Sequence, residues 1–267
     1  MLEINSVSGN SHTVISLLNK TAEYLTHHCP DTPRLDAEVL VAHVLKTDKT
    51  GLYLSFQNPV TEKERKQLQK LVSQRIRREP VSYIIGRKEF WSLTFKVNPA
   101  VMIPRPQTET LVEATIKIFP SGSSPSMLEI GTGSGAISIA LATELPGASI
   151  TATDLSLEAL SVARENAAAN GVNTITFLEG NLFDPLETGG GSFDLIISNP
   201  PYIPTEEISR LPAGIRDYEP YIAFDGGLDG LEYYRKIASN AHHYLEIGGY
   251  LLLEVGYKQS QEVSQII

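Results

Sequence analysis

The strongest indication of the fold is the stretch Met127-Leu128-Glu129-Ile130-Gly131-Thr132-Gly133-Ser134-Gly135. Its apolar half predicts a strand, and its glycines predict a tight turn into a helix. Glycine has no Cβ atom, so the chain can turn sharply there and a ligand can come close to the main chain. With Ala136 in the sixth place, the stretch also satisfies the looser dinucleotide-binding pattern. By itself it indicates a nucleotide-type pocket and leaves a nicotinamide enzyme open.

A carboxylate lies where such a pocket needs one. The next predicted strand, 149–153, is followed by Asp154, 23 positions after Gly131. A carboxylate at the end of the second strand can accept hydrogen bonds from both ribose hydroxyls, in NAD and in S-adenosylmethionine alike. Asp154 is also suited to cap the helix that follows, and the two roles are compatible. Together with the glycine turn, Asp154 predicts an adenosine-type ligand.

The glycine turn belongs to a region in which helices and strands alternate. Apolar spacing predicts helices at 108–119, from the glycine turn to 145 and at 157–170, and strands at 127–130, 149–153, 174–178, 195–198 and 250–255. Apolar strands that alternate with helices form a parallel sheet covered on both faces. We therefore predict an α/β fold for 105–267, preceded by a helical domain, 1–80, and a hairpin linker, 81–104.

Three helices are predicted in the N-terminal domain. The first spans 12–27, and the third, 61–78, begins with a capping box formed by Thr61 and Glu64. The second spans 33–45 and begins at a capping residue before a proline. Its residues expected to point inward are Leu35, Val39, Leu40 and Val44.

The third predicted helix is strongly basic. Its only acidic residues are Glu62 and Glu64, and its basic residues are Lys63, Arg65, Lys66, Lys70, Arg75, Arg77 and Arg78. This pattern fits a solvated helix face, or a docking surface for an acidic partner or for ribosomal RNA. In the linker that follows, 83–86, 89–91 and 93–97 predict short strands around turns.

The composition of the chain argues against several classes of function. The net charge of −9 argues against tight, sequence-independent nucleic-acid binding, because phosphate neutralisation requires clustered Lys and Arg. The longest apolar stretches are too short to cross a bilayer, and 1–5 has no signal-peptide pattern. Cys29 is the only cysteine, which excludes an intrachain disulfide and fits a reducing compartment. We predict a cytoplasmic protein without a metal centre, acting on a small molecule or another protein.

The most specific chemical signal is Asn199-Pro200-Pro201-Tyr202, at the end of the predicted strand 195–198. Each proline lacks an N–H group and has a fixed φ, and Pro201 also forces Pro200 into an extended conformation. The backbone carbonyls are therefore held rigidly beside the Asn199 amide oxygen. Two fixed acceptors suit an –NH2 group. Hydride transfer does not need two such acceptors, whereas methyl transfer to an amide or amino nitrogen does need them. This favours S-adenosylmethionine over NAD as the cofactor.

These residues together resemble the PrmC/HemK protein-glutamine methyltransferases, which modify the Gly-Gly-Gln tip of peptide-chain release factors. The resemblance covers most of the chain. It includes Arg78-Glu79-Pro80, Ile103-Pro104-Arg105-Pro106-Gln107-Thr108-Glu109, the 131–135 loop with Asp154, Asn199 to Tyr202, Glu219-Pro220, Asp225-Gly226-Gly227, Asp229-Gly230-Leu231, Gly248-Gly249 and Glu254-Val255-Gly256. Asn-Pro-Pro-Tyr is shared with amino-methylating DNA enzymes, so the Pro-Arg-Pro segment and the helical N-terminal region are the more specific features.

The resemblance implies a Rossmann-like class I methyltransferase domain, a monomer, and release factors as protein substrates. It implies an S-adenosylmethionine site made of Glu129, Gly131, Thr132, Gly133, Ser134, Gly135, Asp154, Asn181, Leu182 and Asn199. It implies a substrate site made of Arg105, Asn199, Pro200, Pro201 and Tyr202, with Asn199, Pro200 and Tyr202 as catalytic residues. The Asn199 side chain and the Pro200 carbonyl would accept the two amide hydrogens, and Tyr202 would wall the glutamine slot.

Three departures from the family pattern matter. Gln107 stands where the family usually has an acidic residue. A glutamine side chain can still form hydrogen bonds there, but it carries no charge. Asn181 replaces an aspartate near the adenine, so cofactor affinity is in question more than function. The family's fold would continue through two more strands after Ile267, so the sheet is expected to lack its last strands and to expose an edge.

Three alternatives stay open at this point. One is a glutamine methyltransferase of a ribosomal protein, although that group lacks the pattern at 104–109. An amino-directed DNA methyltransferase would need a target-recognition region and a basic face for base flipping. A non-catalytic fragment is the third alternative, because a sheet without its last strands could fail to hold the cofactor.

Overall fold

The computed structural model describes residues 13–186 and 192–267. The chain forms two compact units, which divide between Ile85 and Gly86. The predicted hairpin, as β1 (Arg87–Phe90) and β2 (Leu93–Lys96), belongs to the second unit. Of the sequence features above, 1–5 lies outside the described residues.

The N-terminal unit is a bundle of five helices around its own core. They are α1 (Val14–His28), α2 (Pro33–Leu45), α3 (Lys49–Leu54), α4 (Glu62–Ile76) and α5 (Val81–Ile85). Leu17, Leu40 and Leu68 are buried together in this core. The expectation that Leu35 points inward is wrong, because its side chain is 52% exposed. Ala37 and Val41 face the core instead, one turn apart on the buried side of α2.

Residues 83–85 are helical and Gly86 lies in a turn, so the prediction of a strand at 83–86 is wrong. The Ile84 N–H group donates to the Pro80 carbonyl, which closes one helical turn in α5. Val81, Ile84 and Ile85 pack against the core of the N-terminal unit. β-branched residues favour strands only weakly, and this tertiary packing overrides that preference.

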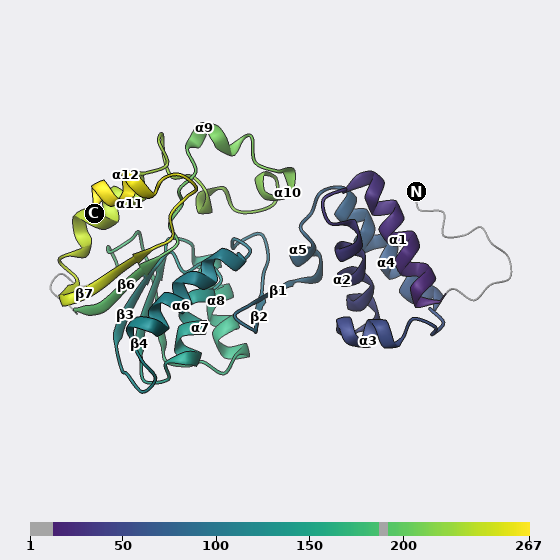
Figure 1. Cartoon of the computed structure of the whole chain (residues 1–267), viewed down its shortest axis with the longest axis horizontal. Helices are drawn as coiled ribbons and strands as arrows, with labels where there is room; N and C mark the ends of the chain where they lie inside the picture. Colours follow the sequence, from purple (N-terminus) through teal and green to yellow (C-terminus); the bar gives the residue numbers. More distant parts are fainter. Residues whose placement is uncertain (1–12, 187–191) are drawn as a thin grey trace. The chain divides into compact units, whose positions relative to one another are not determined.

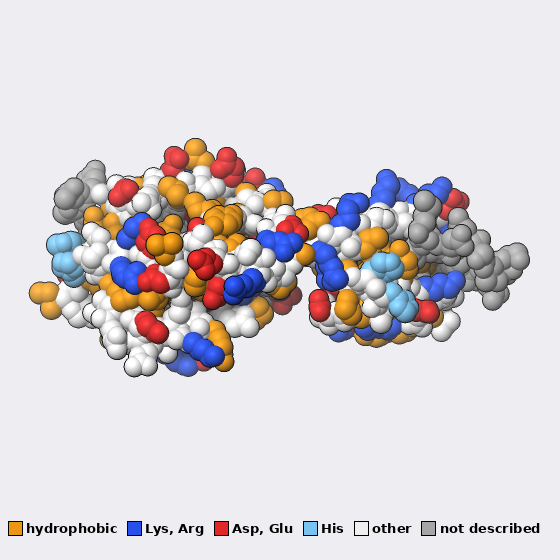
Figure 2. Space-filling model, turned by 90° about the horizontal axis from the view of Figure 1, so that it is seen from above, with side chains coloured by type: hydrophobic (Ala, Val, Ile, Leu, Met, Phe, Trp, Pro, Cys, Tyr) orange, Lys and Arg blue, Asp and Glu red, His pale blue; other side chains and the backbone are white. Residues whose placement is uncertain are grey.

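The basic helix α4 begins with the predicted capping box, in which Thr61 and Glu64 each accept a hydrogen bond from the other's backbone N–H. Lys and Arg side chains gather on the surface of this unit (Figure 2). Arg75 is not part of that surface, because its side chain is only 12% exposed and its Nε lies 2.7 Å from Asp36 Oδ2. Arg75 therefore ties α4 to α2 rather than facing solvent.

The second unit contains a five-stranded parallel sheet in the order β5-β4-β3-β6-β7 (Figure 1). The strands are β3 (Ser126–Ile130), β4 (Ser149–Asp154), β5 (Ile175–Glu179), β6 (Phe193–Ser198) and β7 (Leu245–Leu253). All four pairings are parallel. This confirms the α/β, Rossmann-like fold. In the described part of the chain β7 pairs only with β6 and forms an edge.

Helices cover both faces of the sheet. One face packs against α6 (Glu109–Ile118), which follows η1 (Pro106–Thr108), and against α7 (Ala136–Glu144) and α8 (Leu157–Ala169), with Met127, Ile150 and Ile197 in the shared core. The other face packs against α11 (Glu232–Ala241), with Leu128 and Ile196 in the core. Figure 1 shows these helices on opposite sides of the sheet.

The carboxyl ends of the strands all lie at one edge of the sheet, because the strands are parallel. The loops that leave this edge include α9 (Thr205–Ile208), α10 (Ala213–Arg216) and η2 (Tyr221–Ala223), and the chain ends with α12 (Ser260–Ile266). Among the described residues, no helix has both the length and the apolar character that a bilayer crossing needs. The edge where the loops gather is where the predicted site residues come together.

We expect Arg75→Met to lower the stability of the N-terminal unit by about 3 kcal/mol, because it leaves the Asp36 carboxylate buried without its cation. The measurement is urea unfolding of the full chain, followed by a probe in the N-terminal unit. Lys66→Met on the same helix is the matched control, since the Lys66–Glu62 pair is exposed. The control should change stability by less than about 1 kcal/mol. Equal effects of the two variants would contradict a structural role for the Arg75 pair.

Candidate active site

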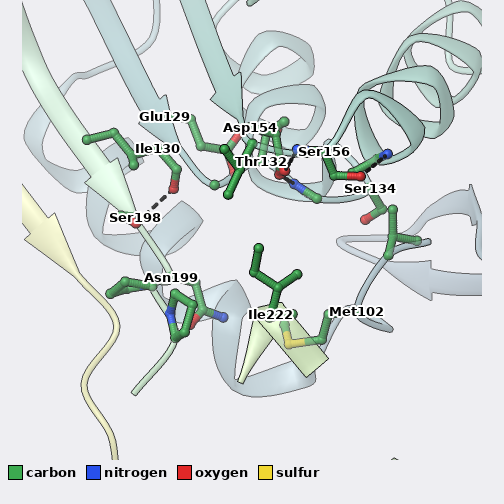
Figure 3. A pocket seen from close by; sticks show the side chains of 18 of the residues that line it. Met102, Glu129, Ile130, Thr132, Ser134, Asp154, Ser156, Ser198, Asn199 and Ile222 are labelled. Carbon is green, nitrogen blue, oxygen red and sulfur yellow. Dashed lines mark hydrogen bonds between the residues drawn. The ribbon is translucent and has the colours of Figure 1, made fainter. Parts of the chain in front are cut away.

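A cavity of about 370 Å³ opens at the carboxyl ends of β3, β4 and β6. Predicted site residues that line it are Glu129, Gly131, Thr132, Gly133, Ser134, Asp154, Asn181, Leu182, Asn199, Pro200 and Pro201. Asn199 lies across the cavity from Asp154 and Ser156, while Met102 and Ile222 enter from separate segments (Figure 3). Gly135, Arg105 and Tyr202 are not part of the lining. The structure thus gathers most of the predicted site at one place.

The backbone of the glycine turn forms one side of the cavity. Gly131 and Gly133 have φ values of +74° and +55°, a region that side-chain-bearing residues rarely adopt. A Cβ atom added at either position would meet no atom within 4 Å, so these glycines border open space. Gly135 is different, since a Cβ there would lie 2.9 Å from Ile139 and 3.2 Å from Ala163. Gly135 therefore serves the close packing of α7 on α8, whereas Gly131 and Gly133 face the cavity.

Asp154 is held by backbone N–H groups at the end of β4. Its Oδ2 accepts from Gly133 N at 2.7 Å and its Oδ1 from Ser156 N at 3.0 Å. Burial raises the pKa of Asp154, and these N–H donors act in the opposite direction. The expected capping role belongs to another residue, because the Ser156 side chain accepts from Ala159 N at the start of α8. Asp154 is thereby left to face the cavity.

Glu129 is a buried carboxylate beneath the glycine turn. Its Oε2 accepts hydrogen bonds from the Thr132 hydroxyl at 2.7 Å, from Ser138 N at 3.2 Å and from the Ser138 hydroxyl. Burial, together with the nearby Asp154 charge, raises the pKa of Glu129 to about 7, although the hydrogen bonds to the carboxylate act in the opposite direction. Glu129 therefore ties the glycine turn to the first turn of α7.

The Asn199 amide is anchored at its nitrogen. Asn199 Nδ2 donates to the Thr108 hydroxyl at 3.2 Å, and that hydroxyl donates to Glu254 Oε2 at 2.7 Å. The next residue, Pro200, also borders the cavity. Because the –NH2 end of Asn199 is used by Thr108, the other end, Oδ1, is the acceptor that the side chain can offer to a ligand.

Arg105 and Tyr202 hold the walls of the site from outside the cavity. Arg105 forms a 2.5 Å ion pair with Glu219, a carboxylate that is 1% exposed and also accepts from Ile103 N. The Tyr202 hydroxyl donates to Glu254 Oε1 at 3.4 Å. Burial raises the pKa of Tyr202, and the Glu254 charge raises it further. The Tyr202 ring packs with Leu231 and Tyr234.

Thr108, Glu219 and Glu254 belong to the sequence motifs, but the pattern of those motifs indicates no role for any of the three. Thr108 lies 91 residues from its partner Asn199, and Glu219 lies 114 residues from its partner Arg105. Glu254 lies 52 residues from its partner Tyr202. Single-sequence spacing cannot reveal contacts of this kind. An acid directly after an apolar strand, as at Glu254, is the one signal that the sequence offers. Within the described ranges, no three His, Cys, Asp or Glu side chains are grouped so that they could hold a metal ion.

Comparison with known proteins gives consistent matches along the chain. Residues 16–86 match the family model of the PrmC N-terminal domain, and 108–211 match the Methyltransferase small domain. The release factor glutamine methyltransferase of Geobacter sulfurreducens is 42% identical over 251 residues, which cover 94% of this chain and 87% of that protein. The same enzyme of Chlorobaculum tepidum is 41% identical over 263 residues, which cover 96% and 89%.

The raised pKa of Glu129 predicts a pH-dependent stability. With a pKa of about 7 in the folded state against 4.5 ordinarily, the folded chain binds more protons than the unfolded chain between about pH 5 and pH 7. Stability should therefore fall as pH rises through this range, by about 3 kcal/mol at most. Glu129→Gln keeps an oxygen for the Ser138 and Thr132 donors and should reduce this slope, because it removes the contribution of Glu129.

Urea unfolding at about pH 5 and pH 7, followed in the second unit, measures the effect. Glu165→Gln is the control, because Glu165 is half exposed on α8 and should leave the slope unchanged. A Glu129→Gln variant with the wild-type slope would contradict the assignment.

Proposed function

The chain belongs to the family of release factor glutamine methyltransferases, and we propose that it carries out the family's reaction with the residues around its cavity. It transfers a methyl group from S-adenosylmethionine to the side-chain amide nitrogen of the glutamine in the Gly-Gly-Gln motif of peptide-chain release factors. The identity of about 40% to relatives of this name over most of both chains carries this conclusion. A cytoplasmic location and a monomeric state remain predictions.

The residues of the cavity fit S-adenosylmethionine. Gly131 and Gly133 border open space where a ligand can approach the main chain, and Asp154 supplies the carboxylate for the ribose hydroxyls. Asn181 and Leu182 line the part of the cavity next to β5 and are proposed to contact the adenine. Thr132 and Ser134 complete the turn, and Glu129 supports it from below. Gly135 is proposed to act through helix packing.

We propose that Asn199 and Pro200 hold the glutamine amide. The Asn199 Oδ1 atom and the Pro200 carbonyl would each accept one N–H bond of the –NH2 group. When bound, S-adenosylmethionine supplies a strongly electrophilic methyl group on a positively charged sulfur. An amide nitrogen is a weak nucleophile, so placing it in line with that methyl is the main task, and such positioning contributes about 7–11 kcal/mol in well-oriented systems. The two acceptors also favour the positive charge that develops on the nitrogen.

Arg105, Pro201 and Tyr202 are proposed to shape the substrate slot. Pro201 borders the cavity and keeps Pro200 extended. Arg105 would act through its ion pair with the buried Glu219, which joins the segment at 103–105 to the loop that carries η2. Tyr202 would act through its contacts with Glu254 and Tyr234 rather than by walling the slot directly.

The direct test incubates the chain with radiolabelled S-adenosylmethionine and a purified release factor, followed by mass spectrometry of the peptide with the Gly-Gly-Gln motif. Methylation of that glutamine is the expected result. Transfer to a ribosomal protein or to DNA instead would select one of the two alternative enzymes. Transfer to none of the three would mean that the chain is not a catalyst.

Asn199→Ala should reduce methylation to less than about a tenth of the wild-type rate, because the glutamine loses one of its two acceptors. The affinity for S-adenosylmethionine, measured by calorimetry, should change little. Asn240→Ala, an exposed position near the end of α11 that does not line the cavity, is the matched control and should retain the wild-type rate. A rate above about a tenth for Asn199→Ala would remove Asn199 from its proposed role.

Asp154→Ala should weaken S-adenosylmethionine binding by about tenfold or more, since the ribose hydroxyls lose their charged acceptor. The measurement is calorimetry with the folded variant, and the same titration with S-adenosylhomocysteine tests whether the loss is independent of the sulfonium charge. Glu165→Ala is the control for removing a carboxylate elsewhere on the same unit. Unchanged affinity in Asp154→Ala would contradict the ribose assignment.

A further inference from the structure

We infer that Thr108 and Glu254 are positioning residues that fix which end of the Asn199 amide faces the substrate. This inference rests on the proposed function, because it concerns how the glutamine is held. The three side chains form a chain of hydrogen bonds in which Asn199 Nδ2 donates to Thr108 Oγ1, and Thr108 Oγ1 donates to Glu254 Oε2. We call this chain the amide relay.

The direction of the amide relay follows from counting hydrogens. A threonine hydroxyl has one hydrogen, and a carboxylate has none. The 2.7 Å contact between Thr108 and Glu254 must therefore use the Thr108 hydrogen. Thr108 can then only accept in its 3.2 Å contact with Asn199. The Asn199 group that faces Thr108 must be the –NH2 end, and Oδ1 must be the end that is left for the substrate.

The opposite orientation of the amide is unfavourable. If the Asn199 amide rotated by half a turn, Oδ1 would face a Thr108 oxygen whose hydrogen is already committed to Glu254. Two lone-pair-bearing oxygens would then meet without a hydrogen between them, and the –NH2 end would point at the substrate –NH2 group. The site would lose an acceptor and gain a donor at the place where the glutamine needs an acceptor. The amide relay prevents this.

The backbone holds the members of the amide relay in place. β6 and β7 pair in parallel with Ser198 opposite Leu253, and the ladder continues as Glu254 N donates to the Ser198 carbonyl at 3.0 Å. Asn199 and Glu254 are therefore the next residues on two neighbouring strands. Thr108 is 4% exposed, at the start of α6. The Tyr234 hydroxyl also donates to the Glu254 carbonyl, at 2.9 Å.

The first test compares Thr108→Val with Thr108→Ser in the methylation assay. Valine has the shape of threonine without the hydroxyl, so kcat should fall by about tenfold to a hundredfold, while the Kd for S-adenosylmethionine stays within about twofold. Serine restores the hydroxyl and should recover at least about half of the wild-type kcat. Thermal melting of each variant checks that it is folded.

The second test reverses the amide relay. In Asn199→Asp, two carboxylates compete for the single Thr108 hydrogen, so kcat should fall by about thirtyfold or more. Adding Glu254→Gln supplies an –NH2 group that donates to the Thr108 hydroxyl. The Thr108 hydrogen can then turn to the new carboxylate at position 199, which completes the chain of hydrogen bonds in the opposite direction. The double variant should be at least about fivefold more active than Asn199→Asp alone.

Glu254→Gln alone measures the effect of the second change by itself, because its amide group can either accept from the Thr108 hydroxyl or donate to it. The outcomes separate the two proposals. A wild-type chain that methylates no glutamine contradicts the proposed function itself. If the wild-type chain is active, either a wild-type kcat in Thr108→Val or a double variant no more active than Asn199→Asp overturns the amide relay. The second comparison stands even if Thr108→Val does not fold.

Discussion

The parallel pairing of β3 with both β4 and β6 is the constraint on which the site depends. Ile130 pairs with Thr153 on one side and with Ser198 on the other, so the three strands end at nearly the same level. The residues that follow them, Gly131, Asp154 and Asn199, must therefore meet at one edge of the sheet. Neither a helical bundle nor an antiparallel sheet would bring these three sequence positions together in this way. The position of the cavity therefore follows from the register in which β3 pairs with β4 and β6.

Three carboxylates, two of them buried and one partly buried, hold together the segments around that cavity. Glu129 accepts three hydrogen bonds from the turn after β3 and the start of α7. Glu219 joins Arg105 and the Ile103 backbone to a loop more than 100 residues away. Glu254 receives hydrogen bonds from two further side chains. Glu129 and Glu219 are buried, and several donors satisfy each of them, as burial of charge requires. All three carboxylates fix the positions of the segments that supply their donors.

Much of the second unit could be predicted from the sequence because its signals are local. The strand predicted at 127–130 is found at Ser126–Ile130, and the helix predicted at 157–170 at Leu157–Ala169. The N-terminal unit is harder to predict from its sequence. Leu35 shares the apolar spacing of α2 but faces solvent. Residues 83–85, which include two β-branched isoleucines, are helical because they pack against other helices. Short apolar runs do not carry enough information to decide between such outcomes.

The chemistry can be inferred from the sequence alone, because its signals are covalent and local: glycines that permit the turn, prolines that hold Asn199 and Pro200 rigid, and an acid after the second strand. The residues that support this chemistry become apparent only in the folded chain. Thr108 and Glu254 lie 91 and 55 positions from Asn199 in the chain, and only strand register and helix packing bring them to it. The direction of a hydrogen bond depends on such distant partners, so it is decided only in the folded molecule.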